Sequence, residues 1–373
     1  MKHSLKKLTA GILAVASLTL SSQVLANNPA PTIKADAPNR YIVKKGDTLW
    51  GISGKYLNKP WQWKEIWATN KQIKNPHLIY PNDVIILCVI QGQQLIGIDT
   101  GEGCAGLEKT EVAPEATLSP TEPQKNSENN VVENVAGSIP AISLTAIEAW
   151  LDRTVIVNPE DFNDTPYVFA SKNKNIITGA GNIVYTNGRP LIVNKRYGVY
   201  RKGKPYIDPM SKKVIGLEVT QVASGDAINV ASNGVSSIEL KKSFGQEVRE
   251  GDRVFLEVGN HLPPVFYPKP AKANRGGRVI RVLNSISSAG RDGVVAINLG
   301  SRQNVSAGDV LTVFKKGALV QDNFAQVKGG GVRLPSEEIG HVMVFKTFDD
   351  ISYAYVLDAE LPISEADYLT NPN

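Results

Sequence analysis

A stretch of 34 residues, 105–138, divides the chain into parts that must fold separately. It contains six glutamates among proline, serine, threonine and asparagine, and it has hardly any large apolar side chains. Because such a segment cannot bury enough apolar surface to offset the entropy of folding, it predicts an extended, disordered acidic linker. The chain of 373 residues is therefore expected to form several domains of ordinary size.

The first 26 residues have the pattern of a secretory signal peptide. Three lysines precede an apolar run from Leu8 to Leu20, and Ala26 ends a cleavage-site pattern. The run is shorter than the roughly 20 residues that a membrane-spanning helix needs. Without these lysines, 38 Lys and Arg remain against 36 Asp and Glu, and no later segment is apolar enough to span a bilayer. We expect an exported protein with no transmembrane segment in the mature chain and no nucleic-acid partner.

Both cysteines, Cys88 and Cys104, lie in the exported part. An oxidising compartment lets thiols pair, and the loop between these two contains four glycines. We expect one structural disulfide. A catalytic thiol is the less favoured alternative, because no histidine lies in a recognisable partner motif.

The sequence beyond the linker is dominated by β-strand patterns. A capping box predicts a short helix over 143–152, after which runs of β-branched and aromatic residues alternate with turn residues. Prolines within 261–277 resist both helix and central strand and indicate a domain boundary. We expect β-rich domains over 139–262 and 277–373. The expected strands include Val214–Thr220, Val279–Leu283, Gly293–Leu299, Val310–Phe314, His341–Phe345 and Ile351–Leu357.

A weak repeat runs through these β-rich domains. An apolar residue is followed three and four positions later by a small residue and an aspartate, at Val248–Asp252, Val305–Asp309 and Ile363–Asp367. The small residue permits a crowded or left-handed turn, and the aspartate can cap backbone N–H groups. The pattern predicts tight strand-to-strand turns in duplicated β units.

Residues 40–88 contain an ordered set of signals for a small α+β module. They predict a strand at Tyr41–Val43, a turn into a helix at Gly46–Leu49, a second helix at Trp61–Asn70 and a closing strand at Val84–Leu87. The set resembles the LysM domain, a βααβ module that binds glycans containing N-acetylglucosamine. Asn82, where the family usually has glycine, and an insertion over Asn58–Trp63 depart from the family pattern. We place the module, with its disulfide-closed extension, at 40–104.

The LysM resemblance implies a shallow groove between the turn after the first strand and the loop before the closing strand. In this chain one side would be Gly46, Asp47, Thr48 and Leu49, and the other Asn75, Pro76, Leu78, Ile79 and Tyr80. Backbone groups would bind the acetamido group of the sugar, and apolar side chains would cover its less polar face. Four tryptophans are expected to pack in the core of the module and not in the groove: Trp50, Trp61, Trp63 and Trp67.

The β-rich half is also similar to a known family. The phrases that carry the similarity are Tyr197–Arg201, Ile207–Pro209, Ile215–Val219, Leu334–Pro335, Glu338–Gly340, Val344–Phe348 and Ser352–Ala354. The last domain resembles the C-terminal domain of the flagellar protein FlgT, and the whole arrangement resembles the TsaP family of type IV pilus secretin-associated proteins. The resemblance implies a periplasmic protein of Gram-negative bacteria that holds the outer-membrane pilus secretin to peptidoglycan.

The rival functions are a cell-wall hydrolase, because LysM modules often target such enzymes, and a peptidoglycan-bound component of the flagellar basal body. His261 and His341 are far apart and lack metal-ligand spacing with each other. Asp226, Asp252 and Asp309 lie in turn contexts that favour capping over catalysis. We therefore expect a non-enzymatic anchor with no catalytic residues, no metal and no cofactor.

Overall fold

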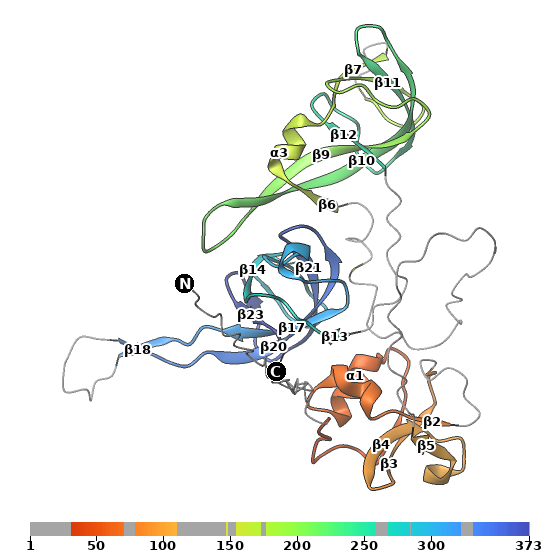
Figure 1. The fold of residues 1–373 in the computed structure, drawn as a ribbon, viewed down its shortest axis with the longest axis vertical. Coiled ribbons are helices and arrows are strands. Elements are labelled where there is room, and N and C mark those ends of the chain that lie inside the picture. Colours follow the sequence, from red (N-terminus) through yellow and green to blue (C-terminus); the bar gives the residue numbers. More distant parts are fainter. Residues whose placement is uncertain are drawn as a thin grey trace, which may run out of the picture.

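The computed structural model describes residues 31–70, 79–109, 147, 154–172, 177–257, 268–283, 285–321 and 331–372. They form an N-terminal α+β module and two β-barrels, which follow one another in chain order from the lower to the upper and then the middle part of Figure 1. The predicted signal peptide and the helix expected over 143–152 lie outside the described residues, apart from Ile147. Among the described helices, none is long and apolar enough to cross a membrane.

The N-terminal module is built on a three-stranded antiparallel sheet in the order β1-β3-β4. Its elements are β1 (Arg40–Ile42), α1 (Leu49–Tyr56), the 3-10 helix η1 (Pro60–Glu65), β2 (Ala68–Asn70), β3 (Val84–Ile90), β4 (Gln93–Ile98), the 3-10 helix η2 (Gly103–Gly106) and β5 (Leu107–Lys109). Thr48 caps the N-terminus of helix α1, because its side chain accepts a hydrogen bond from the Gly51 N–H. Its buried face, with Leu49, Ile52 and Tyr56, packs on the sheet.

The second helix predicted over Trp61–Asn70 is wrong as a continuous element. Pro60–Glu65 forms a 3-10 helix, and Ala68–Asn70 is a strand that pairs with β5. The reason is tertiary: the Ile66 carbonyl accepts from the Ile96 N–H of β4, and Trp67 pairs with the same residue. Pairing with the added strands β4 and β5 therefore overrides the helical spacing of the aromatic residues.

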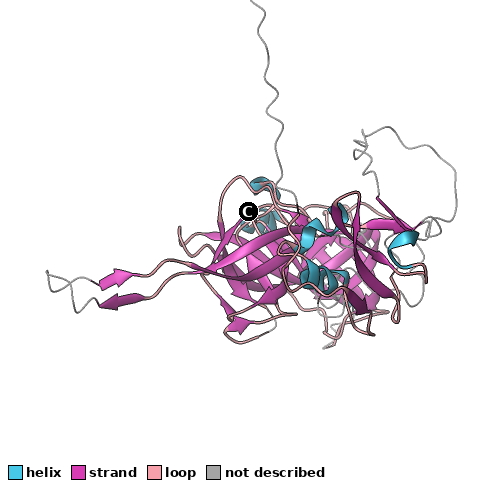
Figure 2. Cartoon of the chain, turned by 90° about the horizontal axis from the view of Figure 1, so that it is seen from below, coloured by secondary structure: helices cyan, strands magenta, loops and turns pink. Residues whose placement is uncertain are grey.

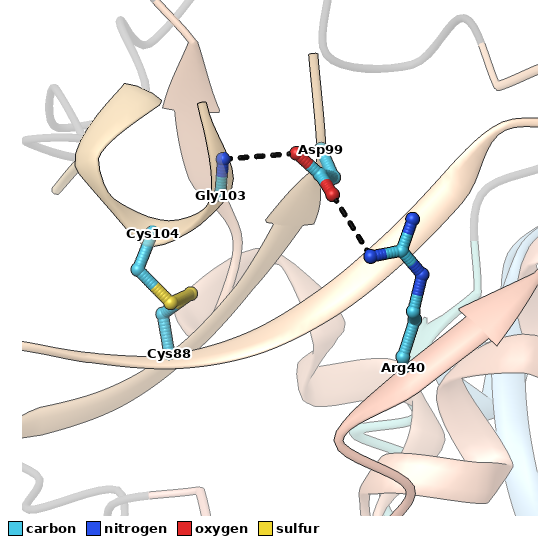
Figure 3. Close-up of a disulfide and its surroundings, with 5 residues drawn as sticks. All are labelled: Arg40, Cys88, Asp99, Gly103 and Cys104. Carbon is cyan, nitrogen blue, oxygen red and sulfur yellow. Dashed lines mark hydrogen bonds and ion pairs between the residues drawn. A yellow bond between two sulfur atoms is a disulfide. The ribbon is translucent and has the colours of Figure 1, made fainter. Parts of the chain in front are cut away.

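The predicted disulfide between Cys88 and Cys104 is confirmed, with the two Cα atoms 5.6 Å apart (Figure 3). The loop that it closes is also held by Asp99, whose carboxylate accepts from the Gly101 and Gly103 N–H groups and pairs with Arg40 at 3.2 Å. These hydrogen bonds lower the pKa of Asp99.

The acidic linker was predicted to begin at residue 105, and its first residues instead belong to the folded module. Leu107–Lys109 is strand β5, and the Leu107 side chain is 5% exposed against Cys88 and Leu95. The pairing of β5 with β2 and the burial of Leu107 beside Cys88 account for this short strand. Residues 110–138 lie outside the described residues.

The first barrel is a closed six-stranded sheet in the ring order β7-β8-β11-β10-β9-β12. Its elements are β6 (Thr154–Val157), α3 (Pro159–Asp164), β7 (Tyr167–Ser171), β8 (Ile183–Asn187), β9 (Arg196–Ile207), β10 (Val214–Val230), β11 (Ser236–Ser243) and β12 (Arg253–Leu256). Strand β6 pairs with the outer end of β10. Strands β9 and β10 continue beyond the barrel as a long hairpin (Figure 1).

The second barrel closes in the ring order β14-β16-β21-β20-β17-β23. Its elements are β13 (Lys269–Pro270), β14 (Gly277–Val282), β15 (Ser288–Ala289), β16 (Val294–Ile297), the 3-10 helix η4 (Ser301–Gln303), β17 (Asp309–Lys315), β18 (Leu319–Gln321), β19 (Gly331–Arg333), β20 (Glu337–Thr347), β21 (Ser352–Ala359), β22 (Ile363–Ser364) and β23 (Tyr368–Thr370). Counting only ring strands in chain order, both barrels have the same connectivity. The second barrel's sheet begins at Lys269, before the predicted start at 277, because β13 pairs with β17.

The turns of the repeat share one geometry. In each, the carboxylate of the final aspartate accepts a hydrogen bond of 2.8 Å from the backbone N–H three residues earlier, and the residue before the aspartate has a positive φ. However, the three turns do not stand at one equivalent position in each barrel. The turns at Asp252 and Asp367 precede the last ring strands of the two barrels, whereas the turn at Asp309 precedes the third ring strand of the second barrel.

The second barrel lies between the other two parts and packs against both (Figure 1). Side chains alternate along its strands, so that Val295 and Val344 fill the interior while Phe345 and Tyr353 point outward and are still buried. This outer face is covered by residues of both neighbours: Trp50, Trp61, Ile156, Tyr206 and Ile215. An apolar outer face explains why three separate folding units form one body.

A two-stranded ribbon, β18 and β19, projects from the second barrel (Figure 2). Leu319 is 63% exposed and Val332 52% exposed on it. Neither strand pairs with a further strand among the described residues, so the ribbon presents two open edges as well as exposed apolar side chains.

Candidate glycan-binding site

The first side of the predicted groove is a tight turn that leads into α1. Gly46 has a φ of +93°, and the Asp47 carboxylate accepts hydrogen bonds from the Lys44 N–H at 2.8 Å and the Tyr41 hydroxyl at 2.9 Å. Burial and then the bond to Asp47 raise the pKa of Tyr41 to about 12, so Tyr41 remains a donor at neutral pH. The Asp47 side chain therefore holds the shape of the turn, and the backbone of the turn remains at the surface of the module.

Two other residues on this side have structural roles. Thr48 caps α1 through its hydroxyl, and the Leu49 side chain is 6% exposed in the core of the module. What this side offers a sugar is therefore mainly backbone at Gly46 and Asp47, together with the parts of Thr48 that remain exposed.

The second side of the groove is described only in part, since Asn75, Pro76 and Leu78 lie outside the described residues. Ile79 is fully enclosed in the core, and Tyr80 is partly exposed. The Tyr80 N–H donates to the Asp83 carboxylate at 2.8 Å in a second copy of the glycine–aspartate turn, with Asn82 at a φ of +82°. Asparagine tolerates this left-handed conformation better than most residues, which explains how it can replace the usual glycine.

Val43 brings the two sides together. Its N–H donates to the Asp83 carbonyl at 2.9 Å, and its carbonyl accepts from the Asn82 N–H at 2.8 Å. The turn at Gly46 and the turn at Asn82, which follows Tyr80, are thus fixed next to each other by backbone hydrogen bonds.

The four tryptophans divide into two pairs. Trp63 and Trp67 form an edge-to-face pair inside the module, with ring centroids 6.0 Å apart. Trp50 and Trp61 stack at 6.3 Å and turn toward the second barrel, where the His341 ring lies 5.4 Å from Trp61. The first pair is in the core of the module as predicted, and the second pair forms an interface that the sequence did not indicate.

A cleft of about 430 Å³ opens beside the first turn. One wall is Gly46, Asp47 and Thr48, and the opposite wall is Arg291 and Asp292 of the second barrel, with Trp50 and Tyr355 also in its lining. Sequence reasoning missed Arg291 and Asp292, because they lie more than 200 positions away in the chain and carry no motif.

The aspartates and the histidine considered as catalytic candidates are engaged in structural contacts. Asp226 pairs with Arg196 at 3.0 Å, and Asp252 with Arg201 at 2.9 Å. His341 lies 3.0 Å from the Asp358 carboxylate. Among the residues that the structure describes, no three His, Cys, Asp or Glu side chains gather closely enough to hold a metal ion.

Comparison with known proteins identifies the module that carries the groove. Residues 41–87 are a LysM domain. The match begins at β1 and ends within β3, so it contains both turns described above. LysM domains bind peptidoglycan and related N-acetylglucosamine glycans, so this domain indicates peptidoglycan binding and association with the cell wall.

A relative of the LysM domain is the uncharacterized protein YqbP of Bacillus subtilis strain 168. The two chains are 42% identical over an alignment of 55 residues, and the match covers 12% of this chain. The chain spans about a quarter of the length of YqbP, so the similarity concerns the LysM domain and does not extend to the barrels.

Proposed function

We propose that this protein is a non-enzymatic, periplasmic anchor that binds peptidoglycan through its LysM domain and stabilises the outer-membrane secretin of a type IV pilus. The observation that carries the wall-binding half is the LysM match over 41–87, with both groove turns held together through Val43. The anchoring half rests on the resemblance of the chain to the TsaP family.

The absence of enzymatic activity is part of the proposal. The aspartates at 226, 252 and 309 are all held in ion pairs or turns, and His341 is packed against Trp61. A general acid or nucleophile must be free to reach a substrate, and these groups are committed to the fold.

The projecting ribbon is the element that we assign to the secretin. A partner strand can add to either open edge, and Leu319 and Val332 provide apolar contacts on the same ribbon. A ring of copies around an oligomeric secretin would also raise the strength of attachment to the wall by multivalency, since one shallow LysM groove binds weakly.

The test is capture of the tagged full chain from envelopes of the producing bacterium, with and without muramidase digestion, followed by mass spectrometry. We expect the secretin to remain bound after the wall is digested. Recovery of wall fragments alone would contradict the pilus assignment, recovery of basal-body proteins would favour the flagellar alternative, and release of muropeptides from purified wall would favour a hydrolase.

A double substitution, L319S/V332S, tests the assignment of the ribbon. We expect it to reduce the recovery of secretin without changing the recovery of wall fragments. I286S is the matched control, because Ile286 is a fully exposed apolar residue of the same barrel that lies outside the ribbon. Equal secretin recovery with all three proteins would contradict the assignment.

A further inference from the structure

We infer that the second barrel completes the glycan site: the cleft between the LysM turn and the barrel takes a carboxylate group carried by the bound glycan, and Arg291 is the residue that binds it. This inference rests on the proposed function of the LysM domain. It adds a residue from outside the LysM domain and a charge requirement on the ligand.

Arg291 faces the LysM turn across the cleft. It lies on the barrel wall of the cleft, opposite the turn at Gly46–Thr48 that forms one side of the LysM groove. Its Nη2 atom is 3.5 Å from the place that a Cβ atom on Gly51 would occupy, so the guanidinium reaches the first turn of α1. A sugar bound at the Gly46 turn would therefore present its substituents toward Arg291.

Four charged side chains line the cleft. The Asp47 carboxylate accepts from Tyr41 and Lys44, and the Tyr355 hydroxyl donates to the Asp292 carboxylate. Arg291 has no ion pair or hydrogen bond within the described part of the chain, and it is exposed to solvent. Lys55 also lines the cleft, and its ammonium nitrogen lies 4.9 Å from the centroid of the Tyr41 ring. The cleft thus contains two satisfied carboxylates, a lysine over an aromatic ring, and a guanidinium with no ion pair or hydrogen bond among the described residues.

The chemistry of a guanidinium selects the ligand. Its planar array of N–H donors matches a carboxylate through two parallel hydrogen bonds, and such charged bonds are stronger than neutral ones. Peptidoglycan strands from which the stem peptides have been removed carry a free lactyl carboxylate on every second sugar, whereas oligomers of N-acetylglucosamine alone are neutral. Arg291 should therefore favour the charged strand over the neutral one.

The interface between the domains makes this selection possible. Trp50 and Trp61 pack with His341 on the outer face of the barrel, and Trp50 is 5% exposed. This contact fixes the distance between the LysM turn and Arg291, so that the two walls of the cleft can act on one ligand. Because the two domains are already docked, a ligand that spans the cleft does not have to order one domain against the other.

The experiment compares two soluble probes on the full chain by calorimetry. One is a glycan strand prepared from peptidoglycan and freed of its peptides, which leaves the lactyl carboxylates exposed, and the other is a neutral N-acetylglucosamine pentamer. We expect R291Q to weaken binding of the charged strand about fivefold, the usual upper range for an exposed ion pair, and to change binding of the pentamer less than twofold. The loss should shrink at high salt, where exposed charges are screened.

R189Q is the matched control, since Arg189 is also exposed and without a partner within the described residues but belongs to the first barrel. It should bind both probes as the parent protein does. Equal binding of the charged strand by R291Q and the parent, or an equal loss for both probes, would overturn the inference while the LysM assignment stands. Failure of the parent to bind either probe would overturn the proposed function as well.

Discussion

One turn, repeated through the molecule, shows how single residues determine this fold. Asp47, Asp83, Asp252, Asp309 and Asp367 each accept a 2.8 Å hydrogen bond from the N–H three residues earlier. The residue before each aspartate has a positive φ, and it is Gly, Asn or Ala. Asp47 resembles a binding residue within the LysM motif, yet its side chain makes the same turn contact as Asp83 and as three aspartates of the barrels, which have no part in the groove.

The positive φ of the residue before the aspartate predicts opposite stability changes for two substitutions. Ala366 has a φ of +71°, where a Cβ atom is strained, so A366G should raise the free energy of unfolding by about 0.5–1 kcal/mol. G251A should lower it by about 1 kcal/mol, because Gly251 has a φ of +90° and no atom near its missing Cβ that could offset the strain. Urea unfolding of both variants checks this, and a loss of stability in A366G would contradict the account.

At the scale of elements, the disulfide and its neighbours extend the LysM domain beyond the matched residues. Strand β4 adds to β3, and β5 closes over β2 with Leu107 buried next to Cys88. The paired cysteines and most strands could be predicted from the sequence, because alternation and cysteine spacing are local signals. The end of the helical pattern after Glu65 could not, because the pairing of β2 with β5 joins residues about 40 positions apart.

Removal of the disulfide should therefore loosen β5 before the rest of the domain. For C88A/C104A we expect a loss of about 3 kcal/mol in local stability, the usual value for a loop of this length, and faster hydrogen exchange at Leu107–Lys109. Hydrogen exchange in α1, which the disulfide does not link to this loop, should change little. Unchanged protection of Leu107–Lys109 would show that Leu107 alone holds this strand.

At the scale of the whole molecule, the second barrel organises the other two parts. The β9–β10 hairpin of the first barrel contacts it through Tyr206, whose hydroxyl lies 3.2 Å from that of Tyr353, and through Glu218, which pairs with Arg281 at 3.2 Å. Burial raises the pKa of both tyrosines, so they stay protonated and hydrogen-bonded. The sequence does not predict these contacts. Aromatic residues on the outer face of a barrel strand give the same alternating sequence pattern whether a neighbouring domain or an opposing sheet covers them.

The contact between the barrels should weaken in acid. Asn298 of the second barrel donates to the Asp208 carboxylate at 2.7 Å. Burial acts to raise the pKa of Asp208. Hydrogen bonds from Ser211 and Asn298 outweigh this effect, so the pKa of Asp208 is lowered. A carboxyl with a lowered pKa stabilises the folded state above the pKa of the unfolded chain, near 3.9, and this contribution is lost as the pH falls through the folded value. We expect the chain to become more extended in small-angle scattering below about pH 4. D208N should show a smaller change over the same range, and an equal change in D208N would contradict the assignment.

The most direct test of the central claim, that the LysM domain attaches this protein to the cell wall, is sedimentation of the full mature chain with purified peptidoglycan sacculi. We predict that the protein pellets with the sacculi, that soluble N-acetylglucosamine oligomers release it, and that no muropeptides appear in the supernatant. Protein that stays in the supernatant with intact sacculi would contradict the account.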